Sequence, residues 1–334
     1  MSEYKGIKGF QVQTRTEDPT PYAQALANNP YARTWSSGGS LNTARSNING
    51  AGVQTAAIAF GGNIASGGPQ PYSVQDLTEN YNGTSWTEVN DLNQARNDTK
   101  GSGTATAGLA VGGYLYPPSA SPSPSVGIQL SVEKWDGTNW TEVAEFSDTR
   151  YGHGISVSSP NSDTMIAGGY TGSPPSATTS AAEVYNGTSW TENTAMSNSK
   201  GRGLGLGAAS TAVLMIDSET ESWNGSSWTE VAEMNSPRSS AGAAGPYTAG
   251  IIFGGSPNNS SVLTELWDGS AWTELNDLGT ARGELGGAGG TSAATSALAF
   301  GGNNSSGTRQ SVTEEWAFSG LPPSTPAAAY ADAI

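Results

Sequence analysis

Six basic residues recur at equivalent places along this 334-residue chain: Arg45, Arg96, Arg150, Lys200, Arg238 and Arg282. Five copies of the surrounding segment also carry a glutamate two residues after a tryptophan, at Glu88, Glu142, Glu192, Glu230 and Glu274. The cations could ring one face and bind an anion, or each could pair with such a glutamate between repeats. Because both residue types recur together, the sequence favours the ion pairs, which contribute about 0–1 kcal/mol each when exposed.

Metal and thiol chemistry have few residues to work with. The chain has no cysteine and one histidine, which excludes disulfides, thiolate chemistry and a zinc or iron site built from His and Cys. The acidic run Asp217–Glu221 lacks the spacing of a calcium loop. We therefore predict no metal site and no cofactor. His153 could be a ligand or a pH sensor, but a histidine hydrogen-bonded near a central channel is favoured.

The charge balance excludes some partners. The chain carries 14 Lys and Arg against 29 Asp and Glu, a net charge of -15. Nucleic-acid binding needs clustered cations, so we predict no nucleic-acid partner. No run approaches the roughly 18 apolar residues of a membrane helix, and the N-terminus lacks the apolar core of a signal peptide. We predict no membrane insertion.

One segment recurs six times and indicates the architecture. An aromatic residue and Asn-Gly or Asp-Gly precede Trp-Thr-Glu in five copies, as in YNGTSWTEV and WDGTNWTEV, and a partial copy opens the array. The anchoring tryptophans are Trp35, Trp86, Trp140, Trp190, Trp228 and Trp272. A strand-rich unit with a period of about 40 to 50 residues predicts the blades of a propeller.

Each unit is predicted to form four strands. An Ala-rich strand ending in Gly-Gly follows a small-residue strand, and a third strand leads through the Asn-Gly or Asp-Gly hairpin into the fourth, at the anchoring tryptophan. Blade four lacks Gly-Gly and should lack the long loop that follows it elsewhere. After Gly301-Gly302 the chain supplies a third strand around Trp316 and no fourth. The strand around Trp35 should complete this last blade, which gives an all-β, six-bladed propeller over residues 34–318.

The Gly-Gly, aromatic and tryptophan pattern over residues 34–318 resembles kelch repeats. The segments YNGTSWTEV, LNTAR and AFGG, together with the opening SEYKGIKGFQVQTRTEDP, resemble kelch-type virion proteins of marine tailed phages, in particular cyanophages. This resemblance implies a non-enzymatic virion structural protein, either a tail or fibre component or a head decoration, located in the virion and assembled in the host cytoplasm. The alternative is a cellular kelch-type scaffold for protein–protein interaction.

The residues argue against the enzymes that use such folds. The copper oxidase built on a kelch propeller needs a Cys-Tyr cross-link and His ligands, which this chain cannot supply. Sialidases use an arginine triad on a six-bladed propeller, whereas the arginines here are repeat-equivalent, which favours a structural role. We predict no enzymatic activity. A carbohydrate-active enzyme, the remaining alternative, would need carboxylates clustered in the central pocket.

The loops between the second and third strands are the predicted binding face, because they present tyrosines among Ser, Gly and Pro on a rigid scaffold. The candidate contacts are Tyr72, Tyr114, Tyr116 and Tyr170, with a host surface glycan or another virion protein as the partner. The alternative is that these long loops have no binding role and persist because a long surface loop costs little conformational entropy.

Two segments flank the predicted propeller. Residues 1–33 carry no repeat and are predicted to anchor the propeller to other virion proteins by strand addition or wrapping. The alternative is a leader without structure in the isolated protein. Residues 319–334 form a Pro- and Ala-rich tail.

Overall fold

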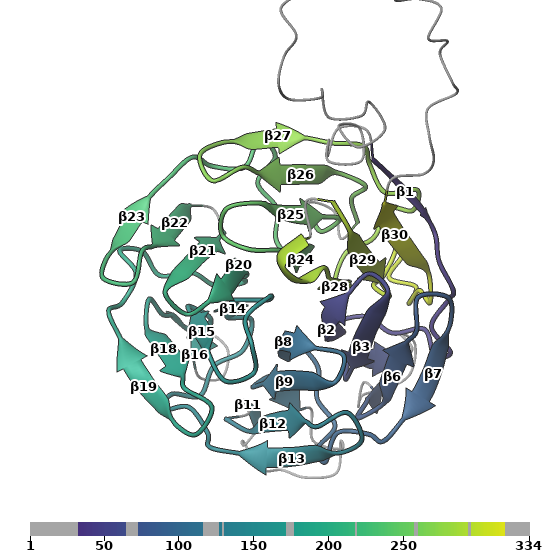
Figure 1. Ribbon diagram of the computed structural model, residues 1–334, viewed down its shortest axis with the longest axis horizontal. Coiled ribbons are helices and arrows are strands. Elements are labelled where there is room, and N and C mark those ends of the chain that lie inside the picture. The colour runs from purple at the N-terminus through teal and green to yellow at the C-terminus, as the bar shows by residue number, and fades with distance from the viewer. Residues whose placement is uncertain are drawn as a thin grey trace, which may run out of the picture.

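The computed structural model describes residues 33–64, 73–115, 127–128, 130–171, 177–217, 219–256, 260–292 and 295–317. They form six four-stranded antiparallel sheets arranged radially about one axis (Figure 1). The predicted all-β, six-bladed propeller is confirmed. The predicted anchoring arm and tail lie outside the described residues, apart from Arg33.

Each blade runs from an innermost strand to an outermost one (Figure 1). Blade 1 contains β2 (Asn49–Val53), β3 (Ala56–Phe60), β6 (Thr78–Tyr81) and β7 (Trp86–Val89); blade 2 contains β8 (Lys100–Thr104), β9 (Ala107–Val111), β12 (Val132–Trp135) and β13 (Trp140–Val143). Blade 3 contains β14 (Gly154–Ile155), β15 (Thr164–Ala167), β18 (Ala182–Tyr185) and β19 (Trp190–Asn193); blade 4 contains β20 (Leu204–Ala209), β21 (Ala212–Ile216), β22 (Thr220–Trp223) and β23 (Trp228–Glu230). Blade 5 contains β24 (Gly242–Ala244), β25 (Gly250–Phe253), β26 (Thr264–Trp267) and β27 (Trp272–Glu274); blade 6 contains β28 (Gly286–Ala288), β29 (Ala297–Phe300), β30 (Thr313–Ala317) and β1 (Thr34–Ser37).

Smaller elements lie outside these sheets. Three two-stranded sheets start the long loops of blades 1 to 3: β4 (Asn63–Ile64) with β5 (Ser73–Val74), β10 (Tyr114–Leu115) with β11 (Gly127–Ile128), and β16 (Tyr170–Thr171) with β17 (Ala177–Thr178). A 3-10 turn covers Gly290–Ser292. In blade 4 the second and third strands are joined by a tight turn around Asp217, as the missing Gly-Gly predicts.

The two outer strands of every blade are held together by an aromatic pair. The aromatic residue at or next to the end of the third strand lies opposite the anchoring tryptophan, with ring centroids 4.9 to 5.4 Å apart. In blade 1 the turn is set by the Asn82 side chain, whose Oδ1 accepts from the amides of Thr84 and Ser85, while Gly83 takes φ 91°. The anchor indoles also bridge blades, since Trp140 Nε1 donates to Thr78 Oγ1 of blade 1. The anchoring tryptophans are therefore structural, because they join strands within a blade and one blade to the next.

The ends of the propeller meet in blade 6. β1 pairs antiparallel with β30 in the register Trp35↔Trp316, so the chain start supplies the outermost strand of the last blade. Trp35 donates through Nε1 to Thr264 Oγ1 of blade 5 and packs edge-on against Phe253. The composite blade thus makes the same aromatic pair and a similar interblade contact as the others, which closes the ring.

The recurring cations pair with glutamates other than those predicted. Each basic side chain reaches the glutamate of the next blade's third strand, and all twelve side chains are at most 5% exposed: Arg45–Glu79, Arg96–Glu133, Arg150–Glu183, Lys200–Glu221, Arg238–Glu265 and Arg282–Glu314. The predicted partners Glu88, Glu142, Glu192, Glu230 and Glu274 are exposed on the outermost strands. The prediction fails because the connection carrying each cation turns inward from the rim, toward the third strand.

The paired carboxylates also hold the backbone of the connections. Glu79 Oε2 accepts from the Asn42 amide at 2.7 Å, and Glu133 Oε2 accepts from the Asn93 amide at 2.8 Å. Each basic residue donates to main-chain carbonyls as well, as Arg45 does to Leu77. These buried, hydrogen-bonded pairs hold each interblade connection in one position. Their burial also excludes the alternative that the six cations form an exposed ring that binds an anion.

The innermost strands leave a narrow central channel, which is closed at one end. A Cβ on Gly101 would lie 2.2 Å from the Gly50 carbonyl of the neighbouring blade, so the innermost strands approach too closely for a larger residue. The connection after β14 bends toward the axis (Figure 1). Its Ser158 contacts blade 4 through the Gly207 carbonyl and the opposite blade 6 through the Gly290 carbonyl. The channel is therefore a well that opens on the other face.

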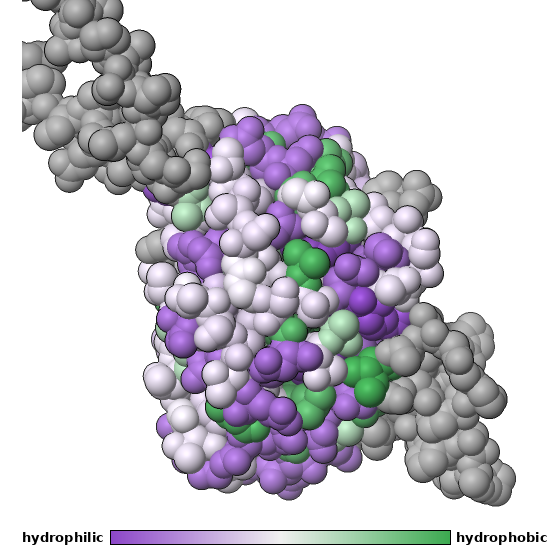
Figure 2. Space-filling view, turned by 90° about the vertical axis from the view of Figure 1, so that its right-hand side faces the viewer, coloured by the Kyte–Doolittle hydropathy of each residue, from purple (hydrophilic) through white to green (hydrophobic). Residues whose placement is uncertain are grey.

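The rim is polar. Figure 2 shows hydrophilic and weakly polar residues with small separate apolar groups on the side that carries β6 and β7. Val53 is the single exposed large hydrophobic residue in the part of the chain that the structure describes. No helix among those residues is long and apolar enough to span a membrane.

Candidate binding site at the channel mouth

Six equivalent residues surround the open end of the channel. They lie two positions after each buried cation, and we call them the mouth ring: Asn47, Asp98, Gly152, Arg202, Ser240 and Glu284. Main-chain hydrogen bonds join four of them in series: Asp98 donates to the Asn47 carbonyl at 3.2 Å, Asn47 to the Glu284 carbonyl at 2.9 Å, and Glu284 to the Ser240 carbonyl at 2.8 Å. These four members are therefore held by their backbones, while the side chains of the ring vary from blade to blade.

The backbone of this ring favours glycine, yet the chain places larger residues there. Asn47, Asp98, Ser240 and Glu284 have φ between 49° and 54°, and they are the non-glycine residues with positive φ in the described part of the chain. Such a conformation costs roughly 1–2 kcal/mol for an L-residue, and Gly152 shows that the ring accepts glycine. Strained residues of this kind concentrate at functional sites, which indicates that the side chains serve a purpose.

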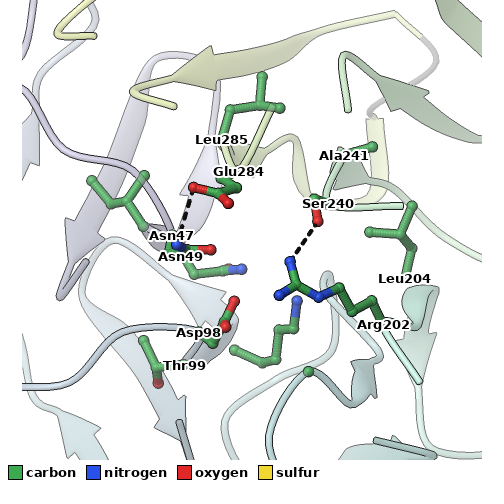
Figure 3. Close-up of a pocket in the computed structure, with 13 residues that line it drawn as sticks. Asn47, Asn49, Asp98, Thr99, Arg202, Leu204, Ser240, Ala241, Glu284 and Leu285 are labelled. Atoms are coloured by element: carbon green, nitrogen blue, oxygen red, sulfur yellow. Dashed lines mark hydrogen bonds between the residues drawn. The ribbon is translucent and has the colours of Figure 1, made fainter. Parts of the chain in front are cut away.

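Charged and polar groups converge inside the ring. Figure 3 shows the Arg202 guanidinium directed into the mouth, where it donates to Ser240 Oγ at 3.1 Å. Glu284 Oε2 accepts from Asn47 Nδ2 and Asn303 Nδ2, both at 3.0 Å. The Asp98 carboxylate raises the pKa of Arg202, and burial, with a smaller contribution from Asp98, raises the pKa of Glu284. The mouth therefore holds a cation and two carboxylates at close range.

Two hollows open from the mouth, each of about 320 Å³, and they share Arg202 and Glu284. Small-molecule sites usually measure about 300–1,000 Å³. One hollow is also lined by Tyr114, Tyr151 and Arg309. Each hollow has room for a ligand about the size of one sugar ring.

Three tyrosines form a continuous aromatic run beside the mouth. The ring centroids of Tyr114 and Tyr151 are 5.4 Å apart, and those of Tyr151 and Tyr170 are 5.3 Å apart and stacked. Tyr170 lies over Gly201, where a Cβ would come within 2.5 Å of its hydroxyl. The run offers flat apolar area next to hydrogen-bonding groups, a combination suited to a ligand with both kinds of surface.

The predicted binding residues fall in part within this site. Tyr114 and Tyr170 are half-buried in the aromatic run, whereas Tyr72 and Tyr116 lie outside the described residues. Sequence reasoning missed Tyr151 and the mouth ring. The sequence does contain a signal for the mouth ring. The residue two positions after the recurring cation is Asn, Asp, Gly, Arg, Ser or Glu, whereas the cation itself is Arg in five repeats and Lys in one.

His153 occupies a core position rather than a polar one. It is fully buried, and neither ring nitrogen has a hydrogen-bond partner among the described residues, which contradicts the predicted hydrogen bond. Its ring lies 6.0 Å from that of Phe146. Burial, together with Lys100 and Arg150, lowers the pKa of His153 well below its usual value. The described residues contain no cluster of three or more metal-ligating side chains.

Comparison with known proteins supports the fold. No family model matches the chain, and no curated protein matches it. Among solved structures, that of YjhT is similar, with a TM-score of 0.63 and 12% sequence identity over 82% of this chain and 95% of that chain. At this identity the likeness shows the six-bladed propeller fold alone.

Proposed function

We propose that this protein is a non-enzymatic, kelch-type phage virion protein whose channel mouth binds a glycan on the host surface. The observation that carries the binding proposal is the run Tyr114–Tyr151–Tyr170 beside Arg202, at the open end of a well closed at its other end. Sugar rings stack on aromatic faces, and their hydroxyls hydrogen-bond to carboxylates, amides and guanidinium groups such as those of the mouth ring.

The binding proposal is tested on a glycan array with the full chain. The wild-type protein should bind a defined class of glycans, and Tyr151→Ala and Arg202→Met should each remove the signal. Tyr247→Ala is the matched control, because Tyr247 lies in the turn between β24 and β25, at the closed end. Unchanged binding in both mouth variants would place recognition elsewhere.

The virion proposal rests on the amino-acid sequences of the repeats and of the opening segment, which resemble those of kelch-type virion proteins. The proposed arrangement anchors residues 1–33 to other virion proteins and presents the mouth outward. Immunogold labelling of purified phage with an antibody against the propeller should mark the head or the tail. Protein found only in infected-cell lysate would contradict it and favour a cellular interaction scaffold.

A second candidate function rests on one observation. Asp98 and Glu284 line the same hollow, and the pKa of Glu284 is raised, so the pair has the composition of an acid and base in glycoside chemistry. Turnover of a panel of chromogenic glycosides, abolished by Glu284→Gln, would establish an enzyme. No turnover, with retained glycan binding, would support the binding module.

A further inference from the structure

The free cations of this acidic propeller gather at one place. Residues 34–317 carry ten basic side chains, and six of them form the interblade ion pairs. The four others are Lys100, Lys134, Arg202 and Arg309. Three of these four, all but Lys134, line the mouth or the well beneath it. In a chain with a net charge of -15, this concentration needs an explanation.

Lys100 lies deepest of the three cations. It is the first residue of β8, and the first residues of the other innermost strands are uncharged: Asn49, Gly154, Leu204, Gly242 and Gly286. Lys100 is half-buried and lines two narrow hollows of about 30 and 20 Å³, but neither of the two hollows of about 320 Å³. Arg202 lines the first of these narrow hollows and both of the larger ones. Among the described residues its ammonium group forms no hydrogen bond and no ion pair within 4.0 Å.

An unpaired, partly desolvated ammonium group is costly. Burial lowers the pKa of Lys100, and the nearby Arg202 lowers it further, while Asp98 opposes them. Arg202 is exposed, forms no ion pair within 4.0 Å among the described residues and donates to one neutral hydroxyl, while the Asp98 carboxylate raises its pKa. An anion beside Lys100 would restore the solvation that its ammonium group has lost, and Arg202 would donate to the same anion, because charge-assisted hydrogen bonds are the strong ones.

The carboxylates of the mouth have different partners, although Asp98 and Glu284 line one hollow together with Lys100 and Arg202. Glu284 already accepts from two amide groups, and it does not line the narrower hollow that Lys100 reaches. Its remaining oxygen and the Asp98 carboxylate suit hydroxyl donors. The closed far end admits a terminal group rather than a threaded chain. The arrangement therefore matches a ligand with an anionic group at one side and hydroxyls at the other.

We infer that the channel mouth binds the anionic group, carboxylate or sulfate, of a terminal acidic sugar, with Lys100 and Arg202 as its counter-ions and with Asp98 and Glu284 accepting from its hydroxyls. This inference rests on the proposed glycan binding and specifies its ligand class. Tyr151 and its neighbours supply the stacking surface for the ring of the same sugar.

The test compares two sugars that differ in one group. Titration of the full chain with methyl glucuronide and with methyl glucoside, followed by NMR, gives both affinities. We expect the glucuronide to bind about ten- to a hundredfold more tightly, as for one or two hydrogen bonds to charged groups. Glucose 6-sulfate, measured in the same way, shows whether sulfate replaces carboxylate.

Single substitutions test whether Lys100 binds the anionic group. Lys100→Met should lower the preference for the glucuronide over the glucoside by about tenfold, as for one hydrogen bond to a charged group, because Arg202 remains as the second counter-ion. Lys134→Met, which removes the same charge away from the mouth, should change neither affinity. Thermal unfolding checks that the variants fold, and Lys100→Gln serves as a second variant if Lys100→Met does not.

Different results would contradict the proposed glycan binding and the inferred recognition of an anionic group. Equal affinity for both sugars, lost in Tyr151→Ala, would overturn the anion inference and leave glycan binding intact. A preference of unchanged size in Lys100→Met would also overturn it. If no sugar binds but inorganic sulfate shifts the Arg202 and Lys100 signals, the anion site holds and the glycan proposal is wrong. No response to any of these probes overturns both.

Discussion

At the scale of the residue, His153 shows how one substitution in a repeat changes the response to pH. The equivalent positions in blades 1 and 6 are Ile48 and Leu285, which pack in the core. His153 has the same burial without a polar partner in the described structure. Its pKa is lowered in the folded protein, whereas the unfolded chain binds a proton below about pH 6.5.

His153→Leu is therefore expected to flatten the pH dependence of stability. Between pH 6.5 and 5 the unfolded state binds the extra proton, so the wild-type free energy of unfolding should fall by up to about 1.4 kcal/mol per pH unit. Above that range the histidine is neutral in both states and has no effect. Urea denaturation of both proteins from pH 8 to 5 measures the difference. Parallel curves would show that His153 takes up its proton equally in the folded and the unfolded state, and would contradict the lowered pKa.

At the scale of the element, the blades are joined by ion pairs that the sequence only partly reveals. Arg96 and Glu133 are both fully buried, and Arg96 also donates to the Ser131 carbonyl and hydroxyl. Buried pairs of this kind add little stability compared with apolar residues of the same shape, but breaking one leaves a charge without a partner. Their role here is to fix how one blade meets the next.

Arg96→Met should lower the free energy of unfolding by about 3–5 kcal/mol, because Glu133 stays buried without its counter-ion. Replacing Glu133 by leucine in the same chain should recover part of this loss. Glu142→Gln is the control, since Glu142 is exposed on β13 and such surface changes stay within about 0.5 kcal/mol. Equal effects of Arg96→Met and Glu142→Gln in chemical denaturation would contradict this assignment.

At the scale of the whole molecule, stability depends on closure. Four cross-strand pairs between β1 and β30, and the Trp35–Trp316 contact at 5.4 Å, join the two ends of the propeller. Without β1, blade 6 would expose the edge of β30, and open edges invite pairing with other chains.

Removal of residues 1–37 should therefore destabilise the propeller far more than removal of residues 1–32, which leaves β1 in place. We expect the loss of the strand pairing and of the partly buried Trp35 contact to lower the free energy of unfolding, with self-association through the exposed edge of β30. Denaturation and size-exclusion chromatography of the two truncated proteins make the comparison. Similar stability would mean that blade 6 does not need β1.

The sequence was sufficient for the architecture because the repeat marks each hairpin with Asn-Gly or Asp-Gly and each rim with tryptophan. It also predicted the closing strand, from the missing fourth strand after Trp316. The ion-pair partners of the arginines could not be chosen from the sequence alone. Glu79 and Glu88 lie opposite each other on paired strands, and only Glu79 is buried. The mouth ring was not predicted, because its members are about 40 to 50 residues apart in sequence and come together only when the propeller closes.

The most direct test of the channel mouth as the binding site is a crystal structure of the full chain with the best glycan from the array. We expect a sugar ring on Tyr151, within hydrogen-bond distance of Arg202 and Glu284. A ligand on the rim or on the outer parts of the loops, with an empty mouth, would contradict it.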